Sequence, residues 1–306
     1  FIVMMTVGLI GSYYVTANFI ARLNRMNTTI DAIVSGDLTE RLVVEDQQSE
    51  ISTLAANMNF MLDRIAELVE GVKQVSDNIA HDLRTPLTRL RNHLVTFEKQ
   101  SSEEDKETVR ELIEETDSIL STFNSLLRIA RIELGEKIKK SPIDLHHLIE
   151  ELLELYEPLA TEKNIALDVA LVDTVIAGDR NLIFQAAANV LDNAIKYTPS
   201  GGRIKLRLSR LDAGNDDILR GSVKALASKP RIASLIISDT GSGVLADNIP
   251  KLTRRFYREE SSRGCLPGSG LGLSLVQAVV KIHDGQLVIR NVPNGGLSVE
   301  MRFVAK

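Results

Sequence analysis

The sequence contains no tryptophan and only one cysteine, Cys265. A single cysteine cannot form a disulfide within the chain or supply a paired-cysteine metal site, so both are excluded. The chain also lacks an excess of positive charge, because 36 Lys and Arg stand against 41 Asp and Glu, a net charge of −5. Since nucleic acids are bound through clustered Lys and Arg, this balance argues against a nucleic-acid-binding protein.

Long charged runs are absent from the N-terminal end. Residues 1–21 carry no charged side chain, and Arg22 and Arg25 follow directly. About 20 apolar residues span a bilayer as a helix, and positive residues mark its cytoplasmic side. We therefore expect residues 1–21 to form a transmembrane helix, the last one along the protein's sequence and truncated at its start. The residues after about Arg22 would then lie in the cytoplasm. A buried helix of a soluble protein is the alternative.

Two helical segments with a seven-residue repeat follow. Apolar residues recur at Ile51, Met58, Ile65, Val72 and Ile79, with a second seam at Leu54, Met61, Leu68 and Val75. Before this heptad segment, a connector of about 15 residues follows a shorter helix over 20–34. After it, the charged stretch 99–106 precedes a second helix with an apolar face at Leu112, Ile119 and Leu126. Heptads of this kind predict a helical hairpin that buries its stripe by dimerising.

The residues after Gly135 change to a mixed pattern. Helices are expected at 145–163, 180–197 and 271–284, and strands at 165–169, 204–209, 234–238, 286–290 and 297–304. The polar segment 212–230 is expected to be a surface loop between two strands. Helices alternating with strands, with a hairpin at the end, predict a two-layer α/β sandwich.

The first chemically suggestive segment contains His81, Asp82, Thr85 and Pro86. A neutral imidazole is a competent nucleophile near neutral pH. Thr85 lies four residues on, so it shares a helix face with His81. Pro86 removes a backbone donor and is expected to bend the helix. A solvated helix face with an incidental histidine is the alternative.

The second segment is a polar stripe on a helix. Asn189, Asn193, Lys196 and Tyr197 are spaced so that they lie on one face. Amide oxygens and an ammonium group in one line suit a hydrated Mg²⁺ and phosphate oxygens. Asn is a poor helix former, which favours a functional reason over an ordinary exposed polar face.

Two glycine-rich segments complete the pattern. Asp239 ends an apolar strand and is followed by Gly241 and Gly243. Its carboxylate can accept a hydrogen bond from the exocyclic amine of a ligand, and the glycines let the ring of that ligand approach the backbone. The segment 268–272 opens a helix whose N–H groups attract phosphate. It is neither a P-loop, since no Gly-Lys-Ser/Thr follows, nor a Rossmann turn, since no βαβ unit surrounds it.

Together, and in this order, the motifs resemble those of the HAMP-containing sensor histidine kinases of two-component systems, with the HisKA type of dimerisation domain. The matching boxes are the H box at 81–87, the N box at 189–197, the first glycine box at 239–243, the F box at 255–258 and the second glycine box at 268–272. The resemblance covers nearly the whole chain.

The resemblance implies a multidomain fold: the end of an N-terminal membrane helix, an all-α HAMP coiled coil and a dimeric helical hairpin forming a four-helix bundle, and then an α/β two-layer sandwich that binds ATP. The expected domains are 1–21 (transmembrane helix), 22–70 (HAMP), 71–135 (dimerisation and histidine phosphotransfer) and 136–306 (ATP binding). The first HAMP helix lacks the proline that many members carry.

The resemblance also implies an activity. His81 would take the γ-phosphoryl group of ATP, Asp82 would orient or deprotonate its ring, and Thr85 would help dephosphorylate the partner. The implied ATP-binding residues are Asn189, Asn193, Lys196, Tyr197, Asp239, Gly241, Gly243, Arg258, Gly268, Gly270, Leu271 and Gly272, with Asn189 and Asn193 holding Mg²⁺. The implied partners are a second copy of the chain and a response regulator, whose aspartate receives the phosphoryl group, at the inner membrane of a bacterium.

Two alternatives stay open. One is an ATPase of the wider group that includes gyrases, mismatch-repair proteins and heat-shock chaperones. Those enzymes use a glutamate as general base at the position of Asn189, and an asparagine cannot take a proton. The other is a catalytically inactive signalling scaffold, against which the intact Asn193, Asp239 and Gly270 argue. None of the remaining histidines has partners at metal-ligand spacing.

Overall fold

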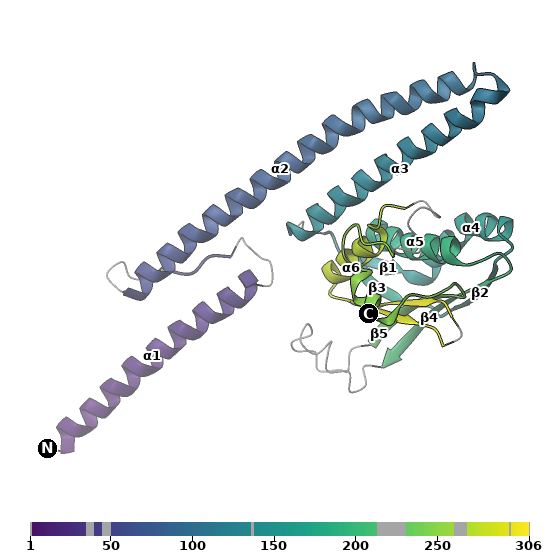
Figure 1. Cartoon of the computed structure of the whole chain (residues 1–306). Coiled ribbons are helices and arrows are strands. Elements are labelled where there is room, and N and C mark those ends of the chain that lie inside the picture. Colours follow the sequence, from purple (N-terminus) through teal and green to yellow (C-terminus); the bar gives the residue numbers. More distant parts are fainter. Residues whose placement is uncertain are drawn as a thin grey trace. The chain divides into compact units, whose positions relative to one another are not determined.

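The computed structural model describes residues 2–34, 40–44, 50–135, 138–212, 231–259, 268–293 and 295–305. The chain divides into two compact units, Phe1–Asn78 and Ile79–Lys306. Three long helices come first, followed by strands and shorter helices (Figure 1). This order confirms the expected multidomain layout, helical first and α/β afterwards. The loop expected at 213–230, Cys265 and the side chain of His81 lie outside the described residues.

The first unit contains α1 (Ile2–Val34) and the beginning of α2 (Glu50–Glu98). The residues from Ile2 to Ile30 form one helix that is long and apolar enough to cross a membrane. Residues 20–34 are helical, as expected, and continue the preceding helix because no Gly or Pro interrupts the chain near Arg22. The predicted 15-residue connector matches the interval between the two helices.

The segment 40–44 is held against α2 by one side chain. Asn59 accepts from the backbone N of Leu42 and donates to its carbonyl oxygen, both at 2.9 Å. Leu42 is buried, as are Ala55 and Leu62 on the facing side of α2. Arg41 adds an ion pair to Asp63 at 2.7 Å. A bidentate amide of this kind substitutes for regular backbone pairing and fixes the segment along the helix.

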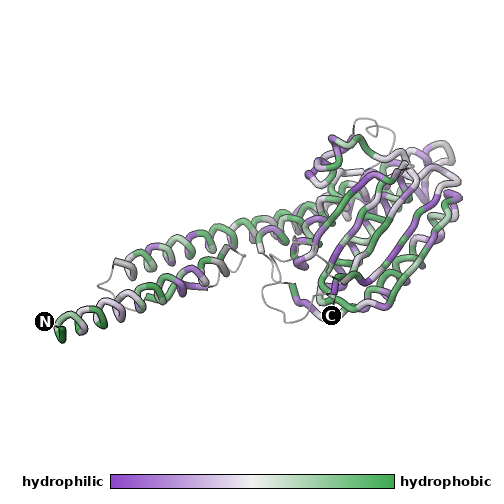
Figure 2. Tube along the Cα trace, turned by 90° about the horizontal axis from the view of Figure 1, so that it is seen from below, coloured by the Kyte–Doolittle hydropathy of each residue, from purple (hydrophilic) through white to green (hydrophobic). Residues whose placement is uncertain are grey.

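Most of the heptad stripe on α2 is exposed in the part of the chain that the structure describes. Seven of its apolar side chains are exposed: Leu54, Met61, Ile65, Leu68, Val72, Val75 and Ile79. In Figure 2 the long helices at the N-terminal end alternate between hydrophobic and hydrophilic residues. An amphipathic helix whose apolar stripe is exposed to solvent is stabilised when another protein surface covers that stripe.

The second unit begins with a hairpin of α2 and α3 (Glu103–Glu133). The pairs Arg91–Asp117 at 2.6 Å and Arg84–Asn124 at 2.8 Å join the two helices. Helix α2 continues through Pro86 as one element. The break between the helices is shorter than the charged stretch 99–106, since α3 already begins at Glu103. Ser102 is the N-cap residue of α3: its carbonyl oxygen accepts from the backbone N of Asp105 and of Lys106 at 3.1 Å, and its hydroxyl donates to the carboxylate of Asp105 at 2.6 Å.

The α/β part consists of a mainly antiparallel sheet with α4 (Leu145–Glu162), α5 (Arg180–Tyr197) and α6 (Gly272–Ile282) on one side of it (Figure 1). The strands are β1 (Ser141–Asp144), β2 (Ala166–Leu171), β3 (Val175–Gly178), β4 (Arg203–Asp212), β5 (Arg231–Asp239), β6 (Gln286–Asn291) and β7 (Leu297–Ala305). Their order is β1-β3-β7-β5-β4-β2, with β6 also paired to β7. Among the described strand pairs, only β2 and β4 run parallel.

The core lies between the helices and the sheet. Ile183, Ala187, Val190 and Ala194, the predicted apolar stripe of α5, are all buried there. The predicted helices and strands are found within a few residues of their expected ends. Strands β1 and β3 and the 3₁₀ helix Ala246–Lys251 were not expected from the sequence. Elements of four to six residues are too short to show a clear periodicity.

Candidate active site

Helix α5 presents the predicted polar stripe because its opposite face is buried. The carboxylate of Asp179 caps the helix, accepting from the backbone N of Asn181 at 2.9 Å and of Leu182 at 3.1 Å. Asn189 and Asn193 are half-buried on the face away from the sheet. Nδ2 of Asn189 donates to the carbonyl of Gln185 at 2.9 Å, which leaves its Oδ1 as an acceptor.

The C-terminal end of α5 is held by a residue that the sequence analysis missed. Nζ of Lys163 donates to the carbonyl oxygens of Ile195 and Lys196 at 2.8 and 2.9 Å. A cation at this end satisfies two carbonyls that have no partner within the helix. Nothing in the sequence connects Lys163 with residues more than 30 positions away. The adjacent Lys196 lies 5.6 Å from the ring centroid of Tyr197, and burial lowers the pKa of its ammonium group.

Asp239 is a buried carboxylate at the end of β5. Its Oδ1 accepts from the backbone N of Gly241 at 2.8 Å and of Leu297 at 3.2 Å. Burial raises the pKa of Asp239 above its ordinary value, and these backbone donors oppose the rise. Oδ2 makes no hydrogen bond to another described residue, so the buried carboxylate retains one acceptor for a ligand.

Glycine is required beside Asp239 because the backbone turns back on itself. A Cβ on Gly241 would lie 2.6 Å from the carbonyl oxygen of Tyr197 and 2.9 Å from Oδ1 of Asp239. The predicted first glycine segment therefore packs closely against both the buried carboxylate of Asp239 and the C-terminal end of α5. Leu297, which supplies the second donor, follows the Gly295-Gly296 pair, and that pair was the sequence signal for a tight turn here.

The second glycine segment lies across the polar face of α5. A Cβ on Gly272 would be 3.4 Å from Oδ1 of Asn189 and 3.4 Å from Nδ2 of Asn193. A Cβ on Gly268 would come closer still, 2.5 Å from Nζ of Lys196. Gly270 has a φ of +70°, a left-handed conformation that favours glycine. Glycine at 268 and 270 therefore lets this segment lie close to the polar face of α5, and we call this glycine-lined surface the cradle.

The segment following β5 is tied to this cradle. Nη1 of Arg258 donates to the carbonyl oxygen of Gly268 at 2.8 Å, and the backbone N of Phe256 donates to that of Gly270 at 3.0 Å. The structure thus brings twelve predicted residues into one region: Asn189, Asn193, Lys196, Tyr197, Asp239, Gly241, Gly243, Arg258, Gly268, Gly270, Leu271 and Gly272.

The predicted phosphotransfer residues lie elsewhere, on the hairpin. His81, Asp82 and Thr85 are all within α2, and the side chains of Asp82 and Thr85 are exposed. In the described part of the chain, no group of three or more His, Cys, Asp or Glu side chains is placed to hold a metal ion.

Comparison with known proteins identifies the parts of the chain. Residues 14–67 match the HAMP domain, residues 71–135 the His Kinase A (phospho-acceptor) domain, and residues 178–306 the histidine kinase-, DNA gyrase B- and HSP90-like ATPase domain. The structure of full-length ShkA in complex with AMPPNP has the same fold, with a TM-score of 0.61 and 24% identity. That similarity covers 76% of this chain and 46% of ShkA.

Two relatives match most of the chain. The signal transduction histidine-protein kinase BaeS of Escherichia coli (strain K12) is 27% identical over 96% of this chain and 60% of BaeS. The signal transduction histidine-protein kinase/phosphatase MprB of Mycobacterium tuberculosis (strain ATCC 25618 / H37Rv) is 31% identical over 81% of this chain and 46% of MprB. This chain thus spans between about half and three fifths of their length. With these three domains in this order, and a glycine-lined cradle within the last of them, the chain belongs to the HAMP-containing sensor histidine kinases of two-component signalling.

Proposed function

We propose that the chain is the signalling half of a membrane sensor kinase, which phosphorylates His81 from ATP and passes the phosphoryl group to an aspartate of a response regulator. The observation that carries this proposal is that Asn189, Lys196 and Asp239, the predicted ligands, each lie close to a glycine of the two glycine segments. Membership of the family, whose ATPase domain uses ATP, supports the same assignment.

The adenine end of ATP fits the pocket around Asp239. Its Oδ2 is the acceptor for the exocyclic amine, since Oδ1 already takes two backbone donors. The close approach of Gly241 to Asp239 leaves no side chain in the way of a flat ring. Tyr197, which is partly exposed beside Gly241, supplies an aromatic surface on which that ring can rest.

The phosphate end fits the polar face of α5. Asn189 and Asn193 present oxygen ligands of the kind that Mg²⁺ prefers, and phosphate oxygens and water would complete the shell. Bound there, Mg²⁺ would neutralise charge on the phosphates. Lys196 and Arg258 contribute positive charge from either side of Gly268, and Gly270, Leu271 and Gly272 offer backbone donors at the start of α6.

The transfer itself requires a nucleophile, and His81 is the proposed one. A ring nitrogen forms the new N–P bond while ADP leaves with the electrons of the broken P–O bond. Asp82, the next residue on α2, orients the imidazole or takes its proton. Thr85 shares the His81 face and is proposed to align water for dephosphorylation of the regulator. The name of MprB includes a phosphatase activity, which supports this last role.

Association and location follow from the helices. We propose a homodimer built on the exposed stripe of α2, anchored in the inner membrane of a bacterium by the span within Ile2–Ile30. The proposed domains remain 1–21, 22–70, 71–135 and 136–306. The last begins before the matched residue 178 because Leu145, Leu148 and Leu152 of α4 belong to the same core as α5.

The chemistry of the product tests the proposed reaction. The chain is incubated with Mg²⁺ and ATP labelled in the γ-phosphate, and the labelled protein is then exposed to acid or to alkali. Phosphohistidine loses its label in acid and keeps it in alkali, whereas phosphoserine and phosphothreonine keep theirs in acid. Acid-labile label supports histidine kinase chemistry, and acid-stable label, or none, contradicts it.

A further inference from the structure

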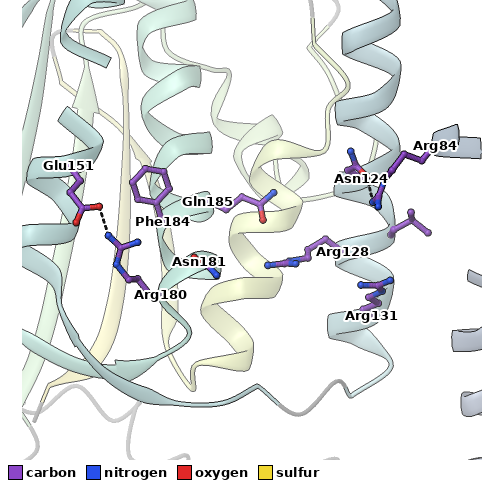
Figure 3. Close-up of a pocket in the computed structure, with 10 residues that line it drawn as sticks. Arg84, Asn124, Arg128, Arg131, Glu151, Arg180, Asn181, Phe184 and Gln185 are labelled. Atoms are coloured by element: carbon purple, nitrogen blue, oxygen red, sulfur yellow. Dashed lines mark hydrogen bonds and ion pairs between the residues drawn. The ribbon is translucent and has the colours of Figure 1, made fainter. Parts of the chain in front are cut away.

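A cavity lies apart from the ATP cradle, between the hairpin and the α/β domain. It has a volume of about 610 Å³ and is lined by residues of α2, α3, α4 and α5. None of the twelve residues of the ATP cradle lines it. Figure 3 shows Arg128 reaching from α3 toward Asn181 at the beginning of α5.

The cavity is strongly positive although the chain as a whole is acidic. Four guanidinium groups line it, from Arg84, Arg128, Arg131 and Arg180, against the single carboxylate of Glu151. The side chains therefore give the cavity a net charge of +3, in a chain whose net charge is −5. Among the described residues, the hydrogen-bond partner of Arg84 is the neutral amide of Asn124, at 2.8 Å, which does not compensate its charge. Such a concentration of one sign within a concave site raises the local concentration of anions.

One of these arginines, Arg128, has a buried hydrogen-bond donor without an acceptor among the described residues. That donor is its Nε atom. A buried charged donor without an acceptor is unfavourable, and native proteins rarely keep one unless a ligand, ion or water satisfies it. The same guanidinium group of Arg128 lines the positive cavity, so an anion in the cavity would compensate its charge.

We propose that this cavity binds a small phosphate-bearing anion from solution. Planar guanidinium groups donate in pairs to phosphate oxygens, and groups from α2, α3 and α5 reach the cavity from separate elements, as a tetrahedral anion with several acceptors requires. The volume exceeds that of one phosphate group, and Phe184 adds an apolar wall, so there is room for a second phosphate or an organic part. An anion held there bridges the hairpin and the α/β domain.

A phosphate group could also come from the chain itself. Arg84 lies three residues after His81 on α2, so the two positions share a helix face. A phosphoryl group on His81 presents the same chemistry as a free anion. The two sources are separable, because only the first one requires His81 and prior phosphorylation.

Calorimetric titration of the full chain in detergent with inorganic pyrophosphate tests the site without ATP or catalysis. The expected result is saturable binding that Arg128→Gln weakens about tenfold or more, the loss of one charge-assisted hydrogen bond. Arg207→Gln removes an exposed charge from β4, outside the cavity, and is the matched control with unchanged affinity. Equal affinities of wild type and Arg128→Gln would overturn the proposal, and would also be the result if pyrophosphate occupied only the ATP cradle.

A variant that gains affinity guards against simple misfolding. Glu151 pairs with Arg180, and Glu151→Gln removes the only carboxylate from the cavity. Pyrophosphate should therefore bind this variant several-fold more tightly, and unchanged or weaker binding counts against the proposal. His81→Gln should bind pyrophosphate like the wild type. If binding requires a phosphorylated His81 instead, the proposal of an anion taken from solution is wrong. Because these titrations need no kinase activity, their failure is distinct from failure of the proposed function.

Discussion

At the scale of single residues, the ATP cradle depends on buried polar groups whose partners come from distant parts of the sequence. Asp239 could be predicted as an acceptor because it ends an apolar strand and precedes two glycines. Its second backbone donor, Leu297, lies 58 positions away and could not be predicted. The same holds for Lys163 at the end of α5. Local spacing reveals which side chains share a face, but not which distant groups satisfy them.

Asp239→Asn tests the acceptor role. The amide keeps the size of the carboxylate but loses its charge, and its nitrogen donates where the adenine amine also donates. We expect ATP affinity to fall at least tenfold, which corresponds to about 1.4 kcal/mol. Asp168→Asn, on the exposed surface of β2, is the matched control. Calorimetry that gives the same affinity for Asp239→Asn and wild type would refute the role.

His283 makes the stability of the domain depend on pH. Its Nε2 accepts from the backbone N of Asp179 at 2.9 Å, and Nδ1 lies 2.7 Å from the carbonyl oxygen of Val279. This arrangement requires the neutral ring, and burial lowers the pKa of His283 below its ordinary value. Lys140 lowers it further, while Asp179 and Asp284 oppose the shift.

The direction of the effect follows from proton uptake. Below the ordinary histidine pKa of about 6.5, the unfolded chain binds a proton that the folded chain excludes. The free energy of unfolding should therefore fall as pH is lowered through about 6.5 and level off below the pKa of folded His283. Urea titrations at several pH values measure this slope, and His283→Gln should reduce it. An unchanged slope in the variant would show that His283 does not contribute.

At the scale of elements, the long periodic segments were predictable and the short ones were not. Helix α5 begins and ends at the expected residues because a strong apolar stripe lies between the capping Asp179 and Pro199. Strands β1 and β3 have four residues each, too few to show an alternating pattern. The loop at residues 99–102 is shorter than expected. The charged residues after it do not prevent a helix, and α3 begins directly after its N-cap residue, Ser102.

Lys163→Met tests how the end of α5 is held. The substitution removes the cation that satisfies the carbonyls of Ile195 and Lys196 but keeps most of the apolar stem. We expect a loss of about 1–2 kcal/mol in the free energy of unfolding, and ATP binding weakened a few-fold because Lys196 and Tyr197 are less well positioned. Lys205→Met, on the exposed face of β4, is the control. Urea melts identical to the wild type would contradict this account.

At the scale of the whole molecule, the exposed stripe on α2 indicates a second chain. Leaving apolar surface in water costs about 25 cal/mol per Å², and several large side chains of the stripe are more than half exposed. The heptads in the sequence predict that a second helix must cover this stripe, since the apolar residues recur over four heptads. The sequence does not predict the arginine-lined cavity, because those arginines come from three separate helices.

Leu68→Glu tests the homodimer. Leu68 is 70% exposed in one chain, so the substitution should be tolerated by the monomer. In the dimer it would bring two carboxylates into an apolar seam, and we expect dissociation at micromolar concentration. Sedimentation equilibrium of the chain in detergent gives the mass of the assembly. Glu67→Gln, one position away from the stripe, should remain dimeric, and a dimeric Leu68→Glu variant would argue against this interface.

The central claim is that His81 receives the phosphoryl group from ATP bound in the cradle of α5, β5 and α6. The most direct measurement is label transfer from γ-labelled ATP to His81→Gln, compared with wild type and with His93→Gln, an exposed histidine on the same helix. The account predicts that His81→Gln takes up no label while its ATP affinity, measured by calorimetry, is unchanged, and that His93→Gln is labelled like the wild type. Label that persists in His81→Gln would contradict the account.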